Sequence, residues 1–83
     1  MNAWEQILRH LQHRLSPESF HNWLEPTRFS HIDGKALYVA VPNETAGRWL
    51  ENEYRGQILE TARQLAMDFQ LVIFIAAGAP RYP

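Results

Sequence analysis

The serines are the residues of this chain that could serve as nucleophiles. A serine hydroxyl attacks a substrate only when a neighbouring base takes its proton, and nothing in the sequence directs a base at Ser16, Ser19 or Ser30. Ser16 is better explained as a helix cap, because it stands directly before Pro17, a residue favoured at the first position of a helix. We therefore predict no catalytic residue and no enzymatic activity in this fragment.

Three of the four histidines raise the question of a metal site. His10 and His13 are spaced to share one face of a helix, and His21 follows in the next predicted helix. Such a set could bind a divalent cation weakly, because imidazole nitrogens are common metal ligands. The same spacing is frequent on polar helix surfaces, and the sequence offers no fourth ligand. Surface histidines are the favoured interpretation, and we predict no metal.

The four glycines are too scattered to form a phosphate-binding loop. Such a loop needs closely spaced glycines, so that backbone N–H groups can approach the phosphate, followed by a Lys-Ser or Lys-Thr pair. Gly34, Gly47, Gly56 and Gly78 stand apart, and none precedes such a pair. We therefore expect neither ATP nor any other cofactor to bind this fragment.

Basic and aromatic residues on a predicted β-hairpin could contact single-stranded nucleic acid. Tyr38 could stack on a base while Arg28 and Lys35 contact phosphates. The chain has eight basic and nine acidic residues, a formal net charge of −1, so it attracts phosphate backbones little. It also lacks the G-x-x-G loop of K-homology RNA-binding domains, because residues 15–18 contain no glycine. Weak single-strand binding is therefore the alternative function and not the leading one.

The length and composition are those of a single folded domain. The chain has 83 residues, of which 46% are hydrophobic and 12% aromatic, so it can bury a small core but has little room for a deep active site. No apolar run approaches the roughly 20 residues that cross a bilayer. The chain has no cysteine, and its start lacks the pattern of a secretory signal. We expect a cytoplasmic protein without membrane contact.

Two helices are predicted at the start of the chain. The first covers residues 3–14 and begins after the capping residue Asn2. The apolar residues of both helices recur at helical spacing and are Trp4, Ile7, Leu8, Leu11, Leu15, Phe20, Trp23 and Leu24. The second helix begins at Pro17, is capped by Ser16 and ends before Pro26. The two helices are therefore expected to form a hairpin.

Two strands joined by a tight turn are predicted next. Residues 28–32 and 35–41 are extended runs on either side of Asp33-Gly34, a dipeptide typical of a type I′ turn. The leucine and valine residues of the second run alternate with other residues, so we expect them to face the helices. Tyr38 is then expected on the more exposed face.

One long helix and a third strand complete the predicted fold. Asn43 caps a helix whose apolar stripe runs from Ala46 to Leu65. Gly56 lies in its middle, where it marks either a bend or close helix contact, or a tolerated surface position. Residues 70–76 are apolar and β-branched, and we expect them to join the hairpin as a third strand.

The predicted order of elements is helix, helix, strand, strand, helix, strand. It belongs to the α+β class, with a three-stranded sheet packed with helices, and it is K-homology-like without the G-x-x-G loop. Residues 1–76 are expected to form this domain, and residues 77–83, rich in glycine and proline, to begin a linker. The expected core includes Phe20, Trp23, Leu37, Val39, Trp49, Tyr54, Ile58 and Phe74.

Several motifs taken together resemble the N-terminal domain, domain I, of the DnaA family of bacterial chromosomal replication initiators. These motifs are Trp4 near the start of the first helix, residues 15–20 followed by Trp23, Leu24 and Pro26, residues 40–43 at the end of the second strand, and Trp49, Leu50 and Tyr54 in the third helix. The resemblance covers essentially the whole chain. It implies that an ATP-binding AAA+ domain and a duplex-DNA-binding domain follow in a longer protein.

The resemblance implies an interaction module that does no chemistry itself. Domain I of this family associates weakly with itself, which helps initiators cluster at the replication origin. It also docks the replicative helicase DnaB and species-specific regulators. The partners implied for this chain are therefore a second copy, DnaB and regulatory proteins, with at most weak contact to single-stranded DNA.

Residue by residue, the resemblance assigns self-association to Trp4 and partner docking to the starts of the second and third helices. Glu18, Ser19, Glu44 and Thr45 stand there, and the resemblance places these two helix starts side by side. Ser19 and Thr45 replace an acidic and an aromatic residue of the best-known members. Glu18 could supply the missing charge, although neighbouring residues of a helix point about 100° apart.

The three tryptophans have a second interpretation, which is burial in the core. Trp23 and Trp49 each lie within a full apolar stripe, so we expect both of them in the core. Trp4 lies at the end of its helix, where a large aromatic can stay exposed and anchor an interface. Core and interface are therefore equal alternatives for Trp4.

Overall fold

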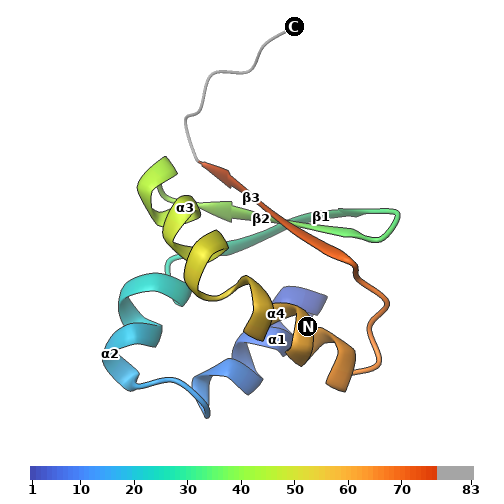
Figure 1. The fold of residues 1–83 in the computed structure, drawn as a ribbon, viewed down its shortest axis with the longest axis horizontal. Helices are drawn as coiled ribbons and strands as arrows, with labels where there is room; N and C mark the ends of the chain where they lie inside the picture. Colours follow the sequence, from blue (N-terminus) through green and yellow to red (C-terminus); the bar gives the residue numbers. More distant parts are fainter. Residues whose placement is uncertain (77–83) are drawn as a thin grey trace, which may run out of the picture.

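Helices cover one face of a three-stranded sheet in the computed structural model (Figure 1). The structure describes residues 1–76, so the linker predicted over residues 77–83 lies outside the described residues. Its elements are α1 (Ala3–Gln12), α2 (Pro17–Ser19), η1 (Phe20–Leu24), β1 (Arg28–Asp33), β2 (Ala36–Val41), α3 (Glu44–Glu53), α4 (Arg55–Gln64) and β3 (Leu71–Ala76). None of the helices in this described part is long and apolar enough to cross a membrane. The arrangement confirms the α+β class and the three-stranded sheet packed with helices.

β2 is the central strand of the sheet. It pairs antiparallel with β1 and parallel with β3, and α3 and α4 form the crossover that a parallel connection requires. Leu37, Val39 and Val41 are buried in the core beneath the helices, as predicted. Tyr38 is half-buried on the opposite face. The alternation of side chains along β2 therefore indicated correctly which face of the sheet the helices cover.

The core differs from the predicted one at its aromatic residues. Its buried members are Trp4, Ile7, Leu11, Leu24, Leu37, Val39, Val41, Leu50, Ile58, Ala62 and Val72. Leu37, Val39 and Ile58 are among them as predicted, but Trp49 is 41% exposed. The other expected members, half-buried at the margin of the core, are Phe20, Trp23, Tyr54 and Phe74. A domain of this size has few fully buried positions, and here aliphatic side chains take most of them.

The short second helix begins as predicted and then widens. The Ser16 hydroxyl accepts a hydrogen bond from the Ser19 N–H (3.2 Å), which confirms Ser16 as the cap. After Ser19 the chain forms a π-helical turn, in which the Glu25 N–H donates to the Phe20 carbonyl (2.9 Å). Turns of this kind are rare and are frequent at functional sites, so η1 is a segment to inspect for function.

The hairpin turn is centred one residue later than predicted. Gly34 and Lys35 occupy the loop between the paired residues Asp33 and Ala36, so Asp33 belongs to β1. Gly34 has a φ of 60°, and Lys35 is not among the described residues with positive φ. This pattern matches a type II′ turn with glycine in first place, and the predicted type I′ turn is wrong.

The long third helix predicted from the sequence is two helices. Tyr54 interrupts it with φ −121° and ψ −7°, although its N–H still donates to the Leu50 carbonyl (2.9 Å). The break lets α3 pack on β3 while α4 packs on α1. Gly56 lies just after the break, and no atom lies within 4 Å of the position that a Cβ would take there. Gly56 is thus a surface position and not a close helix contact.

Replacing Ala66 by glycine is expected to stabilise the domain by about 0.5–1 kcal/mol. Ala66 ends α4 in the left-handed conformation, with φ 60°. Its N–H donates to the Arg63 carbonyl (3.0 Å), and the Met67 N–H donates to the Ala62 carbonyl (2.9 Å). These are the two bonds of a Schellman motif, whose left-handed residue is usually glycine because a Cβ is strained there.

Urea denaturation measures this effect. Gln57→Gly, at an exposed position of α4 with ordinary helical conformation, is the control, because glycine in such a position is expected to cost about 1 kcal/mol instead. A lower stability of Ala66→Gly would contradict the strain argument.

Candidate functional site

Two tryptophans stack on each other at the surface between η1 and α3. The ring centroids of Trp23 and Trp49 are 5.0 Å apart, and the ring planes differ by 25°. Trp49 is 41% exposed. Tryptophan is enriched among the residues that dominate protein interfaces, and the stack holds this pair in one orientation before any partner arrives. The pair is therefore suited to anchor another protein.

Ser19 and Thr45 flank the tryptophan pair. Each precedes its tryptophan by one helical turn, Ser19 before Trp23 and Thr45 before Trp49. Figure 1 shows α2 below the start of α3, with η1 leading from α2 toward the sheet. We name Ser19, Trp23, Thr45 and Trp49, together with Glu18 next to Ser19 in the sequence, the α2–α3 surface.

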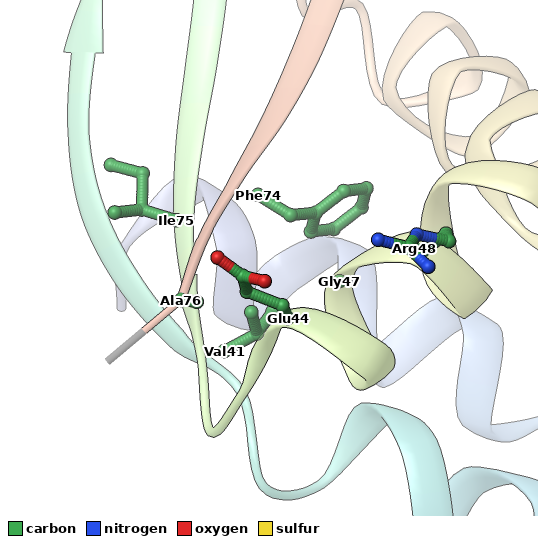
Figure 2. A pocket seen from close by; sticks show the side chains of 7 residues that line it. All are labelled: Val41, Glu44, Gly47, Arg48, Phe74, Ile75 and Ala76. Carbon is green, nitrogen blue, oxygen red and sulfur yellow. The ribbon is translucent and has the colours of Figure 1, made fainter. Parts of the chain in front are cut away.

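The starts of α2 and α3 do not lie side by side as the resemblance implied. α2 begins at the lower left of Figure 1 and α3 at the upper left, with η1 between them. Glu44 lines a groove between α3 and β3 together with Arg48 and Phe74 (Figure 2). Thr45 lies on the side of Trp49, because neighbouring helical residues point about 100° apart. Of the residues predicted for docking, Glu44 therefore lines this groove, whereas Thr45 stands on the face of α3 that carries Trp49.

Trp4 is a core residue, so the structure decides between its two alternatives. Its side chain is 1% exposed. Its indole N–H donates to the Thr27 hydroxyl (2.8 Å), which in turn donates to the Leu24 carbonyl. Thr27 is itself buried, and the chain that returns from η1 therefore covers the start of α1. Of the two alternatives for Trp4, the structure shows burial in the core, which the first helix alone could not indicate because the segment that covers its end comes from elsewhere in the chain.

The first three quarters of the chain can be compared with known proteins. Residues 1–64 match the family described as the DnaA N-terminal domain. The chain belongs to this family. A similar protein is the chromosomal replication initiator protein DnaA of Gloeobacter violaceus, 34% identical over 62 residues. These residues are 75% of this chain and 14% of that protein, so the chain spans a small part of its relative.

In this DnaA N-terminal domain the residues predicted to contact single strands lie along the β1–β2 hairpin. Tyr38 stacks on His31 of the neighbouring strand, with ring centroids 4.3 Å apart and planes at 9°. His31 was not expected here, because its place beside Tyr38 depends on the bulged register of the strands. Lys35 in the turn pairs with Asp68 (3.1 Å), and Arg28 starts β1. The two basic residues therefore lie at opposite ends of the hairpin, with the aromatic stack between them.

The histidines of this DnaA N-terminal domain are dispersed. Within residues 1–76 no group of three or more His, Asp or Glu side chains is placed to hold a metal ion. Nδ1 of His10 lies 3.3 Å from the Gln6 carbonyl oxygen, and Nδ1 of His21 lies 3.0 Å from Oε2 of Glu25. Each of these two histidines is engaged by a residue of its own helical segment.

Proposed function

We propose that this DnaA N-terminal domain is the protein-docking domain of a bacterial replication initiator. In this proposal it binds the replicative helicase DnaB and regulatory proteins, and it associates weakly with a second copy when initiators gather at the origin. It does no chemistry itself, and other domains of the longer cytoplasmic protein bind ATP and duplex DNA. Membership of the DnaA N-terminal domain family and the name of the relative, a chromosomal replication initiator protein, support this role.

The single observation that carries the docking function is the exposed tryptophan pair. Protein interfaces combine an apolar, often aromatic, centre with a polar rim. Trp49, stacked on Trp23, supplies such a centre, and Glu18, Ser19 and Thr45 supply polar groups in the first turns of α2 and α3. Covering apolar surface contributes about 25 cal/mol per Å², so a partner that covers Trp49 gains free energy there.

Charge reversal is expected to separate Glu18 from Glu44. Glu18→Lys should weaken DnaB binding about fivefold to tenfold, because reversing a rim charge slows association with a surface of complementary charge. Glu44→Lys is the matched control, since each glutamate stands in the first turn of its helix. Both changes therefore lose the same favourable interaction with the helix dipole, about 0.3–1 kcal/mol. We expect Glu44→Lys to leave DnaB binding unchanged.

Isothermal titration calorimetry with purified DnaB measures both affinities, and thermal melting checks that each variant folds. Equal losses in the two variants would contradict the division of these glutamates between two surfaces. Unchanged binding of both would remove Glu18 from the docking surface.

Weak binding of single-stranded DNA is a second candidate function with one supporting observation. The stacked rings of His31 and Tyr38 lie on the sheet face opposite the helices, where a base could stack on them. The formal net charge of −1 limits the affinity. Fluorescence anisotropy with a short single strand discriminates the two functions, since affinity tighter than about 1 μM at physiological salt would make nucleic acid the main ligand.

A further inference from the structure

The two edges of the sheet differ in how they are protected from other strands. β1 carries Arg28, His31 and Asp33 and is broken by a bulge between Phe29 and His31, features that discourage pairing with another strand. β3 has the sequence Leu-Val-Ile-Phe-Ile-Ala, without a charge, a proline or a bulge. Within residues 1–76 no strand pairs with its far side. The edge of β3 is therefore open to strand addition.

The backbone of β3 presents hydrogen-bonding groups at this edge. The Leu71 N–H donates to the Lys35 carbonyl (3.2 Å), on the side of β2. Alternate residues of a strand direct their N–H and C=O groups to opposite sides, so Val72 and Phe74 direct theirs to the open edge. A second copy of β3, lying antiparallel, presents the same groups. Val72 of each copy can then exchange two hydrogen bonds with Phe74 of the other.

This register is centred on Ile73, and it places apolar side chains of one copy opposite apolar side chains of the other. Leu71 and Ile75, which are 46% and 39% exposed, then lie opposite each other across the two copies, and Ile73 lies opposite its own counterpart. Cross-strand pairs of large apolar side chains stabilise a sheet, and their exposed surface is removed from water. A register centred on Phe74 would place Leu71 opposite none of the residues of β3 in the other copy.

The charges beside the edge fit the same two-fold axis. A groove between β3 and the helices runs along the strand, lined by Glu44 and Arg48 toward Ala76 (Figure 2) and by Glu51 and Arg55 toward Leu71. When two copies lie antiparallel, Glu44 comes opposite Arg55 and Arg48 opposite Glu51. Each charge therefore meets one of opposite sign, which favours this arrangement over a parallel one.

We propose that the open edge of β3 is the self-association surface of this domain, and that β3 of a second copy occupies it in the antiparallel register centred on Ile73. The inference rests on the self-association included in the proposed function. The edge of β3 carries exposed side chains and can serve this association, whereas Trp4 is buried and cannot. The two sheets join into one continuous sheet, and the two-fold symmetry closes the assembly at a dimer.

Cysteine cross-linking tests the register in the full chain, which contains no native cysteine. In the proposed register Ile73 faces its counterpart as a pair without hydrogen bonds, with Cα atoms about 4.5 Å apart, within the span of a disulfide. I73C is therefore expected to form a covalent dimer under mild oxidation, whereas the controls I75C and I32C are not. Cross-linking of I73C no faster than that of I32C overturns the proposal.

Lysine substitutions test the same surface without a covalent bond. L71K and I75K are each expected to weaken dimerisation at least about tenfold in sedimentation equilibrium, because a charge on an edge strand opposes strand pairing. I32K is the matched control, since Ile32 lies on the other edge strand and is as exposed as Leu71, at 46%. We expect I32K to dimerise like the wild type, and circular dichroism checks that all three variants fold.

The outcomes distinguish this surface from the proposed function. At about millimolar concentration even a dimer with a Kd of about 1 mM would be detected. A wild-type chain that stays monomeric there contradicts self-association and, with it, the β3 surface. A wild-type dimer that neither L71K nor I75K weakens leaves self-association standing and overturns the β3 surface.

A charge swap tests the alignment of the helices. R48E or E51R alone brings like charges together across the two-fold axis and is expected to weaken the dimer severalfold. The double variant R48E/E51R restores opposite charges and is expected to recover most of the affinity. A double variant as weak as the worse single variant overturns the proposed register.

Discussion

Replacing Trp4 by alanine is expected to lower the free energy of unfolding by about 3–5 kcal/mol, the largest change in stability that we predict for this domain. Trp4 is 1% exposed and belongs to the core cluster, so its truncation leaves a cavity among apolar side chains. Domains are stable by only about 5–15 kcal/mol, and this loss is a large share of that. Urea denaturation followed by circular dichroism measures it, and an unchanged midpoint would contradict the buried position.

The buried hydrogen bond of Trp4 can be separated from its volume. Thr27→Val keeps the shape of the side chain but leaves the Trp4 indole N–H without its acceptor, at a cost of about 1–3 kcal/mol. Trp4→Phe removes the donor instead. The double variant W4F/T27V is expected to lose less stability than the sum of the single variants. Strict additivity would show that the bond does not couple the two residues.

The burial of Trp4 decides how a defect in self-association of a Trp4 variant should be interpreted. A Trp4 variant that fails to dimerise does so because it unfolds, since the side chain has almost no exposed surface. Only variants that keep the melting temperature of the wild type report on an interface.

Replacing Trp49 by alanine is expected to act mainly on binding. DnaB affinity should fall by about 2 kcal/mol, roughly 30-fold in Kd, because central aromatic anchors contribute most of the affinity of an interface. Stability should fall by only about 1 kcal/mol, since the side chain is 41% exposed and loses chiefly its stack on Trp23. This expectation replaces the core role that the apolar stripe of α3 predicted.

Ile32→Ala is the control for Trp49→Ala. Ile32 is a large hydrophobic residue, 46% exposed, on β1 and outside the α2–α3 surface. Calorimetry with DnaB and urea denaturation should be carried out on both variants. Binding lost equally in both would point to a general effect of surface changes, and a Trp49 variant as unstable as Trp4→Ala would return Trp49 to the core.

Local sequence signals determined where most elements begin and what type they are. Asn43 caps α3 as predicted, because its Oδ1 accepts a hydrogen bond from the Ala46 N–H (2.8 Å). Ser16 caps α2 in the same way. Alternation along β2 determined its buried face. These signals act between residues close together in the chain, so they can be read without knowing the fold.

Local signals failed where two conformations suit the same residues. Asp33-Gly34 and Gly34-Lys35 can each form a two-residue turn, and the pairing of β1 with β2 selected the second. The stripe from Ala46 to Leu65 is compatible with one straight helix. Packing of α3 on β3 and of α4 on α1 requires a break, which falls at Tyr54.

The candidate site depended on tertiary structure most of all. An apolar stripe shows which face of a helix is covered, but not which residues of that face reach the centre of the core. Thr27 returns over the start of α1 and buries Trp4, whereas nothing among the described residues covers Trp49 to the same extent. The sequence therefore determined the family, the fold class and most of the elements. Only the packing of segments distant in the chain decided which tryptophan is core and which is surface, because burial depends on neighbours that local spacing does not specify.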